Sequence, residues 1–301
     1  MSRIKQKIVP FTGCATALIT PFTKDGVDEP AFERLIERQI AAGVAALVVL
    51  GTTGEPPTLS AREKAKLVRA AVKTAAGRVK IIAGVGGNDT ANSVESCRIM
   101  RDEGADGLLA VTPYYNKTSP SGLIAHFTAL ADSADIPLIV YNVPGRTGLN
   151  LSADTMSVLA DHPRVAALKE ASSNIEQIIE LFVRCHDRIA IYGGSDDQNF
   201  VYLALGGEGV ISVLSNLAPK PVAQMIERFQ KGDLSGARAD AALLHPLAKA
   251  LFCEVSPIPL KAALAHIGLC EETLRLPLVP IREDLREKLL SIVDAYPRPF
   301  A

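Results

Sequence analysis

Lys169 ends a short apolar run, Val165 to Leu168, that has the composition of a buried strand. Burying an ammonium group costs several kcal/mol. A lysine aimed inward at a strand end therefore favours the uncharged amine, which attacks carbonyl carbons. A free lysine has a pKa of about 10.4, and reactivity near neutral pH requires roughly 7–8, a shift that apolar burial can supply. The sequence predicts that Lys169 forms a Schiff base. The alternative is a lysine at a frayed strand end whose ammonium reaches solvent.

Other reactive side chains also stand where apolar runs end. Tyr141 closes the preceding run, and its phenol can both donate and accept a proton. Thr52 and Thr53 lie between glycines, in a loop whose backbone N–H groups can approach a small carboxylate. Arg146, five residues after Tyr141, can bind a second carboxylate through two hydrogen bonds. The alternatives are a tyrosine at the rim of the core, an ordinary glycine turn and a surface arginine.

Eight short apolar runs could carry these side chains as strands. They are Cys14–Thr20, Ala46–Leu50, Lys80–Gly84, Gly107–Thr112, Pro137–Asn142, Val165–Lys169, Ile189–Tyr192 and Gly209–Val213. The runs are apolar on both faces rather than alternating, which is typical of parallel strands covered by helices.

Amphipathic stretches fill the gaps between these runs. Helices are expected over Asp28–Ala42, Ser60–Ala76, Thr90–Glu103, Ser119–Ser133, Ser152–Ala160, Asn174–His186, Asp196–Leu205 and Pro219–Gln230. Eight βα units predict an α/β fold, a (β/α)8 TIM barrel, in which chemistry takes place at the C-terminal strand ends. Three further helical stretches, Leu234–Phe252, Ile258–His266 and Ile281–Ala295, have no strands between them. The expected domains are a barrel over 1–232 and a C-terminal helical subdomain over 233–301.

Composition excludes several other classes of protein. The net charge is −1, which gives no electrostatic reason to bind nucleic acid or an anionic membrane. No apolar run approaches the roughly 20 residues of a membrane-spanning helix, and Met1–Pro10 lacks the apolar core of a signal peptide. A cytoplasmic protein is expected. Neither the cysteines nor the histidines have metal-ligand spacing, and no dinucleotide or Walker motif occurs, so no metal or cofactor is expected.

Several motifs together resemble the dihydrodipicolinate synthase family, within the superfamily of pyruvate-dependent class I aldolases that includes N-acetylneuraminate lyase. The resemblance runs from about Gly13 to the segment Ser256–Lys261. The motifs that carry it are Gly51-Thr52-Thr53-Gly54-Glu55, Thr112-Pro113-Tyr114-Tyr115-Asn116, Tyr141-Asn142-Val143-Pro144-Gly145-Arg146-Thr147-Gly148, Lys169-Glu170-Ala171 and Gly209-Val210-Ile211-Ser212-Val213.

The resemblance implies four catalytic residues. Lys169 matches the Schiff-base lysine and Tyr141 matches the general acid and base. Thr52 and Tyr115 match the other members of the proton relay, with Tyr115 reaching across a dimer interface into the neighbouring site.

The resemblance also implies substrate-binding residues. Thr53 matches the residue that holds the pyruvate carboxylate, and the backbone of Ile211 is expected against pyruvate. Arg146 matches the residue that receives the carboxylate of the second substrate, and Gly194, after the seventh strand, is placed in the same group.

The implied reaction is the condensation of pyruvate with L-aspartate 4-semialdehyde to 4-hydroxy-tetrahydrodipicolinate, in lysine and diaminopimelate biosynthesis, by a homotetramer built from two dimers. One alternative is a sibling aldolase that acts on a sugar acid or hydroxy-keto acid. Another is a non-catalytic keto-acid binder on the same barrel. The Gly51-Thr52-Thr53 sequence and Arg146 favour the synthase.

Some members of the family carry a feedback site for lysine, which Tyr114 and Asn88 match. Ala61 and Lys64 fall where lysine-sensitive bacterial members carry histidines, and Asn92 falls where they carry a glutamate. Without that carboxylate the ammonium of an inhibitor loses its partner, so weak or absent inhibition by lysine is expected.

Overall fold

Eight parallel strands form a closed barrel, in the order β1, β10, β9, β8, β7, β6, β5, β4. The computed structural model of the protein describes residues 6–297 and 300. The barrel strands are β1 (Gly13–Ala17), β4 (Ala46–Val49), β5 (Lys80–Gly84), β6 (Gly107–Val111), β7 (Leu138–Asn142), β8 (Val165–Glu170), β9 (Ala190–Gly193) and β10 (Gly209–Ser212). The predicted TIM barrel is confirmed, with each strand at its expected place in the chain.

The strands that carry the reactive residues are buried on both faces. Every residue of β7 and β8 is buried, which is what uninterrupted apolar runs predict for parallel strands under a layer of helices. The first strand is shorter than expected and ends at Ala17 rather than Thr20. Just beyond its end, the backbone N–H of Ile19 donates to the Asn216 side chain instead of to a neighbouring strand.

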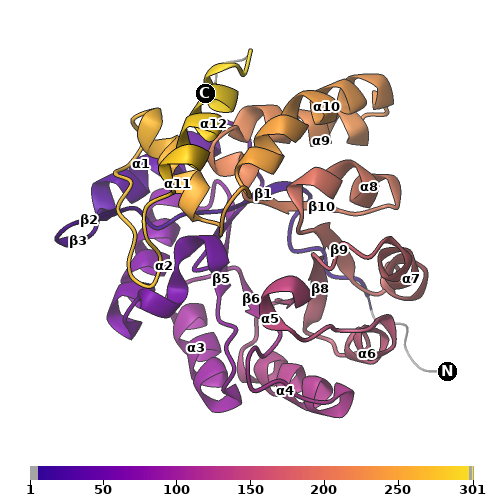
Figure 1. The fold of residues 1–301 in the computed structure, drawn as a ribbon. Helices are drawn as coiled ribbons and strands as arrows, with labels where there is room; N and C mark the ends of the chain where they lie inside the picture. The colour runs from indigo at the N-terminus through magenta and orange to yellow at the C-terminus, as the bar shows by residue number, and fades with distance from the viewer. Residues whose placement is uncertain (1–5, 298–299, 301) are drawn as a thin grey trace. The chain divides into compact units, whose positions relative to one another are not determined.

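The described chain divides into two compact units. The first unit comprises the chain up to Thr12 together with Ile82–Ile211. Its helices α3 (Thr90–Asp102), α4 (Pro120–Ser133), α6 (Ala153–Leu159) and α7 (Ile175–Cys185) follow one another side by side along the outside of its strands (Figure 1). The predicted helix Asp196–Leu205 is a 3-10 turn over Asp196–Gln198 followed by α8 (Asn199–Ala204). The short α5 (Pro144–Thr147) was not predicted.

The second unit comprises Gly13–Ile81 and the chain from Ser212 onward. It contains α1 (Glu29–Ala41), α2 (Ala61–Ala75), α9 (Pro219–Gln230), α10 (Leu234–Ala250), α11 (Ile258–His266) and α12 (Glu283–Asp294). Ser60 and Glu63 form a capping box at the start of α2, where the helix expected from Ser60 begins. A hairpin of β2 (Phe22–Thr23) and β3 (Gly26–Val27) was not predicted, because its strands are too short for periodicity to reveal.

The tail after the barrel is helical, as expected. In the second unit α10 packs against α9, and α11 packs against α12. The predicted division into domains over 1–232 and 233–301 stays a prediction, and residues 1–5, 298, 299 and 301 of those ranges lie outside the described residues. Over the part of the chain that the structure describes, no helix combines the length and the apolar character needed to cross a bilayer.

Candidate active site

Lys169 lies at the end of β8, directly opposite Tyr141 on β7. Lys169 is 5% exposed and Tyr141 is 7% exposed, so both side chains are enclosed. The Nζ atom of Lys169 lies 4.2 Å from the centre of the Tyr141 ring. The prediction of a buried lysine at a strand end beside Tyr141 is therefore confirmed, and a surface lysine is excluded.

Burial changes the proton affinity of both groups. It lowers the pKa of Lys169 to about 8; the carboxylate of Asp196 acts against this shift, and the guanidinium of Arg146 acts with it. A substantial fraction of the amine is therefore uncharged near neutral pH. Burial raises the pKa of Tyr141 to about 12, so its phenol remains protonated and able to donate.

A second pair of buried side chains lies one residue further along the same two strands. Asn142 and Glu170 are opposite each other, and the Nδ2 group of Asn142 donates to Glu170 Oε2 at 3.0 Å. The backbone N–H of Ser172 donates to the other carboxylate oxygen at 2.6 Å. Successive side chains of a strand point to opposite faces. This pair therefore links the ends of β7 and β8 from the face opposite to Tyr141 and Lys169.

Sequence reasoning missed the Asn142–Glu170 pair. The available signal was that an amide follows Tyr141 and an acid follows Lys169, at the ends of neighbouring strands. Burial raises the pKa of Glu170, whereas hydrogen bonds from Ser172 and Asn142 act in the opposite direction.

Gly194 follows β9 and lies against Lys169. Its backbone N–H donates to the carbonyl oxygen of Glu170 at 2.8 Å. A Cβ atom at this position would lie 2.9 Å from that carbonyl oxygen and from the Ala171 Cβ, and 3.1 Å from the Lys169 Cε. Only glycine fits here without displacing the lysine.

The other predicted residues of the first unit occupy different environments. Ile211, on β10, is 1% exposed. Arg146 lies on α5 with an exposed side chain, close enough to influence the pKa of both Tyr141 and Lys169. Tyr115 is 90% exposed and has a φ of 68°, a conformation that is strained for an aromatic residue. Within this unit Tyr115 is therefore not part of the buried cluster.

Thr52 and Thr53 belong to the second unit and form a 3-10 turn over Thr52–Gly54, directly after β4. Thr53 is 4% exposed, whereas Thr52 is exposed. The turn is flanked by two non-glycine residues in the left-handed region, Leu50 with φ 61° and Glu55 with φ 55°. The Thr20 hydroxyl donates to the Gly54 carbonyl oxygen at 2.8 Å and so holds the last residue of the turn.

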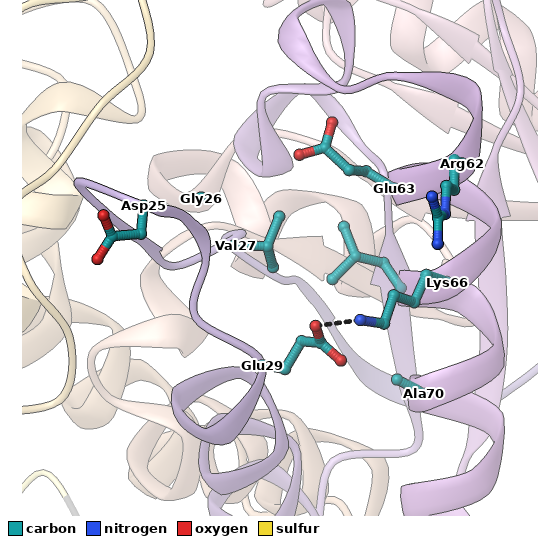
Figure 2. A pocket seen from close by; sticks show the side chains of 9 residues that line it. Asp25, Gly26, Val27, Glu29, Arg62, Glu63, Lys66 and Ala70 are labelled. Atoms are coloured by element: carbon teal, nitrogen blue, oxygen red, sulfur yellow. Dashed lines mark hydrogen bonds and ion pairs between the residues drawn. The ribbon is translucent and has the colours of Figure 1, made fainter.

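A separate pocket of about 290 Å³ lies in the second unit, between the β2–β3 hairpin and α2 (Figure 2). Lys66 and Glu29 form an ion pair within its lining. Glu63, also in the lining, binds Arg275, and this hydrogen bond lowers the pKa of Glu63 to about 2. These charged groups are partnered with protein side chains, and the lining offers no nucleophile beside a base.

Metal binding receives no support from the described part of the chain, where no group of three or more His, Cys, Asp or Glu side chains is placed to hold an ion. The arrangement around Lys169 can instead perform amine chemistry: a buried nucleophile, a neutral phenol beside it and a guanidinium nearby.

Comparison with known proteins agrees with this chemistry. The model of the dihydrodipicolinate synthetase family matches residues 10–296. A 4-hydroxy-tetrahydrodipicolinate synthase from Exiguobacterium sibiricum is 47% identical, over 95% of this chain and 98% of the relative. The crystal structure of dihydrodipicolinate synthase from Aquifex aeolicus superposes with a TM-score of 0.93 at 42% identity, covering 95% of this chain and 98% of that chain.

A third relative was solved with a ligand. It is the dihydrodipicolinate synthase from Acinetobacter baumannii complexed with pyruvate, with a TM-score of 0.92 at 39% identity, covering 94% of this chain and 98% of that chain. The match of the family model over nearly the whole chain, the identity to the relatives and the shared barrel lead to one conclusion: this chain belongs to the dihydrodipicolinate synthetase family.

Proposed function

We propose that this chain is a 4-hydroxy-tetrahydrodipicolinate synthase that joins pyruvate to L-aspartate 4-semialdehyde through a Schiff base on Lys169. The observation that carries the proposal is the buried Lys169 amine, with its lowered pKa, against the ring of Tyr141. The names of the relatives and the pyruvate complex of one of them support the choice of substrates.

The proposed reaction begins when the uncharged Lys169 amine attacks the keto carbon of pyruvate and water leaves. The resulting iminium draws electrons from the adjacent methyl group, which loses a proton to give an enamine. The enamine carbon attacks the aldehyde. The amino group of the second substrate then displaces the lysine nitrogen, which closes the ring and frees Lys169. Tyr141, Thr52 and Tyr115 would carry the protons of these steps.

Binding of the substrates is assigned to groups around these residues. Thr53 would hold the carboxylate of pyruvate, with the backbone of Ile211 against it and Gly194 leaving room for the imine. Arg146 would receive the carboxylate of the semialdehyde through paired hydrogen bonds. The exposure of Arg146 in this chain suits a residue that meets the second substrate after the imine has formed.

Assembly forms part of the proposal because of Tyr115. An aromatic side chain that is 90% exposed on a strained backbone suits a residue that enters a neighbouring copy. We propose a cytoplasmic homotetramer of two dimers in which Tyr115 completes the site of the partner chain. Mixing inactive K169A with Y115F and allowing subunits to exchange would restore activity, since each hybrid dimer gains one complete site. A mixture that stays inactive despite exchange would contradict the shared site.

The central experiment is incubation with pyruvate and borohydride, followed by peptide mapping. Reduction should fix pyruvate on Lys169, and a K169A variant should remain unlabelled. A coupled assay with aspartate semialdehyde then separates the synthase from an aldolase that acts on a sugar acid or hydroxy-keto acid. Labelling without turnover of any aldehyde would favour a keto-acid binder, and absence of labelling would overturn the proposal.

A further inference from the structure

Glu55 and Lys261 form an ion pair in the interior of the second unit. The Nζ atom of Lys261 lies 2.5 Å from Glu55 Oε1, and the two side chains are 0% and 1% exposed. Glu55 directly follows the turn that carries Thr52 and Thr53, whereas Lys261 belongs to α11 in the helical tail. The pair therefore connects the two chain segments that make up the second unit, the one near the N-terminus and the helical tail.

Further contacts surround the Lys261 ammonium. It donates to the carbonyl oxygen of Thr273 at 2.9 Å and lies 4.1 Å from the centre of the Phe22 ring. The guanidinium of Arg275 lies 4.4 Å from the same ring, and the Arg275 backbone N–H donates to Glu55 Oε2 at 3.2 Å. Burial lowers the pKa of Lys261, while the Glu55 carboxylate acts in the opposite direction. Both carboxylate oxygens of Glu55 are thus bound to the tail.

Arg275 adds a second link between the tail and this region. Its side chain donates to the carbonyl oxygen of Thr58 at 2.8 Å and forms an ion pair with Glu63 on α2. Side-chain exposure of Arg275 is 25%, so this link lies nearer the surface than the Glu55–Lys261 pair. The segment after the threonine turn is held at its first residue and again three residues later.

Stability alone is a weak reason for such a pair. Taking two charges out of water costs about as much as their attraction returns, and apolar replacements of buried pairs are often as stable. The backbone suggests a different role. Glu55 adopts a left-handed conformation that few residues other than glycine favour, and such strain persists only where the surroundings impose it.

We propose that Glu55 and Lys261 are positioning residues that fix the Thr52–Thr53 turn for substrate, so that the helical tail sets the geometry of the pyruvate-binding loop. This inference rests on the proposed function of Thr53. Neither side chain is assigned a contact with pyruvate. Their effect passes through the backbone of the turn, which ends at Glu55.

The test compares E55Q, K261M and the double variant E55Q/K261M. Each single change leaves one charge buried without its partner, so melting temperature and activity should both fall. The double variant removes both charges, and its melting temperature should return toward that of the unmodified protein. If the pair positions the turn, the double variant should still need about tenfold more pyruvate for half-maximal borohydride labelling of Lys169, because small displacements of binding groups weaken binding sharply.

R275Q is a second test variant, at a residue that is less buried than Glu55 and Lys261. It removes the link to Thr58 and Glu63 and the contact with the Phe22 ring, leaves the Glu55–Lys261 pair in place, and should raise the KM for pyruvate a few-fold with little change in melting temperature. The matched controls are K231M and E227Q, which break an exposed lysine–glutamate pair on the surface of the same unit and should leave KM unchanged. If the double variant does not fold, R275Q still tests whether the tail sets the geometry of this loop, because Arg275 binds the same segment at Thr58.

Two results separate this inference from the proposed function. Unmodified protein that pyruvate and borohydride fail to label would remove the proposed function itself. Suppose instead that the unmodified protein is labelled, and that R275Q and any folded double variant have the same KM for pyruvate as the unmodified protein. Only the positioning role would then be overturned, and the ion pair would be a purely structural feature.

Discussion

The Nζ atom of Lys169 lies 4.2 Å from the centre of the Tyr141 ring, and the two residues are directly opposite each other on parallel strands. A neutral phenol with a pKa of about 12 beside an amine with a pKa of about 8 separates the roles of the two groups. The amine can lose its proton near neutral pH, whereas the phenol keeps its proton until it is needed.

The pH dependence of imine formation should follow Lys169. The amine is uncharged above its pKa, so the rate of labelling by subsaturating pyruvate and cyanoborohydride should rise with pH and level off above about 8. Tyr141 stays protonated throughout this range, so the pH profile should show no decrease at high pH from its ionisation. A midpoint near the roughly 10.4 of an exposed lysine would contradict the effect of burial.

Replacing Arg146 should separate the two half-reactions. R146Q removes a charge that lowers the pKa of Lys169, so the labelling profile should move to higher pH. At a pH where the amine is uncharged, pyruvate labelling should change by less than about twofold, while kcat/KM for the semialdehyde falls about 100-fold with the loss of a paired, charge-assisted contact. R184Q, on the exposed face of α7, is the matched control and should change neither quantity. Equal losses in both half-reactions would remove the assigned role.

A methyl group at position 194 should disturb Lys169. G194A places a Cβ atom 3.1 Å from the Lys169 Cε and 2.9 Å from a backbone oxygen that cannot easily move. We expect a loss of about 1–3 kcal/mol in the free energy of unfolding, from overpacking, and at least a tenfold slower labelling by pyruvate. G145A is the control, since a Cβ there meets no atom within 4 Å. Urea unfolding and single-turnover labelling measure the two effects, and a fully active G194A would show that the strand end can relax.

Replacing Glu170 with glutamine should destabilise the protein. Its two oxygens each accept a hydrogen bond, from Ser172 and Asn142, and a glutamine has only one acceptor oxygen. In E170Q the new amide group is a donor and must face one of the two donors that now bind Glu170. The substitution should therefore lower the free energy of unfolding by about 1–3 kcal/mol. Activity should fall through misalignment of Tyr141 and Lys169. The double variant N142A/E170Q removes the opposing amide donor and should recover part of the lost stability. Unchanged unfolding in E170Q would show that the pair does not hold the strands.

Lysine should inhibit this chain weakly or not at all. Asn92, at the first turn of α3, has no negative charge to offer an ammonium, and its Nδ2 group donates to Asp89 at 3.0 Å. Lys64, on α2, would add a like charge. Assays with millimolar lysine measure the effect. An inhibition curve that saturates in this range would refute the expectation.

Patterns that are local in sequence predicted most of the fold. The apolar run before Lys169 predicted a strand buried on both faces, and the amphipathic stretch from Ser60 predicted the start of α2. The burial of Lys169 also followed, because an amine that closes such a run has little access to water. Short elements escaped prediction, as in the hairpin of two-residue strands around Asp25 and Gly26.

Contacts between distant segments could not be read in the same way. The pairing of Asn142 with Glu170 depends on the register of two strands, and the pairing of Glu55 with Lys261 depends on where the tail packs. Neither relationship leaves a local pattern in the sequence. The exposed Tyr115 has a left-handed backbone conformation that its residue type does not favour, so no pattern in the sequence indicated it.

The enclosure of Lys169 also affects folding. Once the chain unfolds, the amine regains its ordinary proton affinity, so the unfolded form binds more protons between pH of about 8 and about 10.4. The free energy of unfolding therefore rises with pH across this interval, and below it the fold forgoes roughly 3 kcal/mol on account of one side chain. An apolar residue at this position would carry no such penalty, so the enclosed amine lowers the thermal endurance of the fold below pH of about 8.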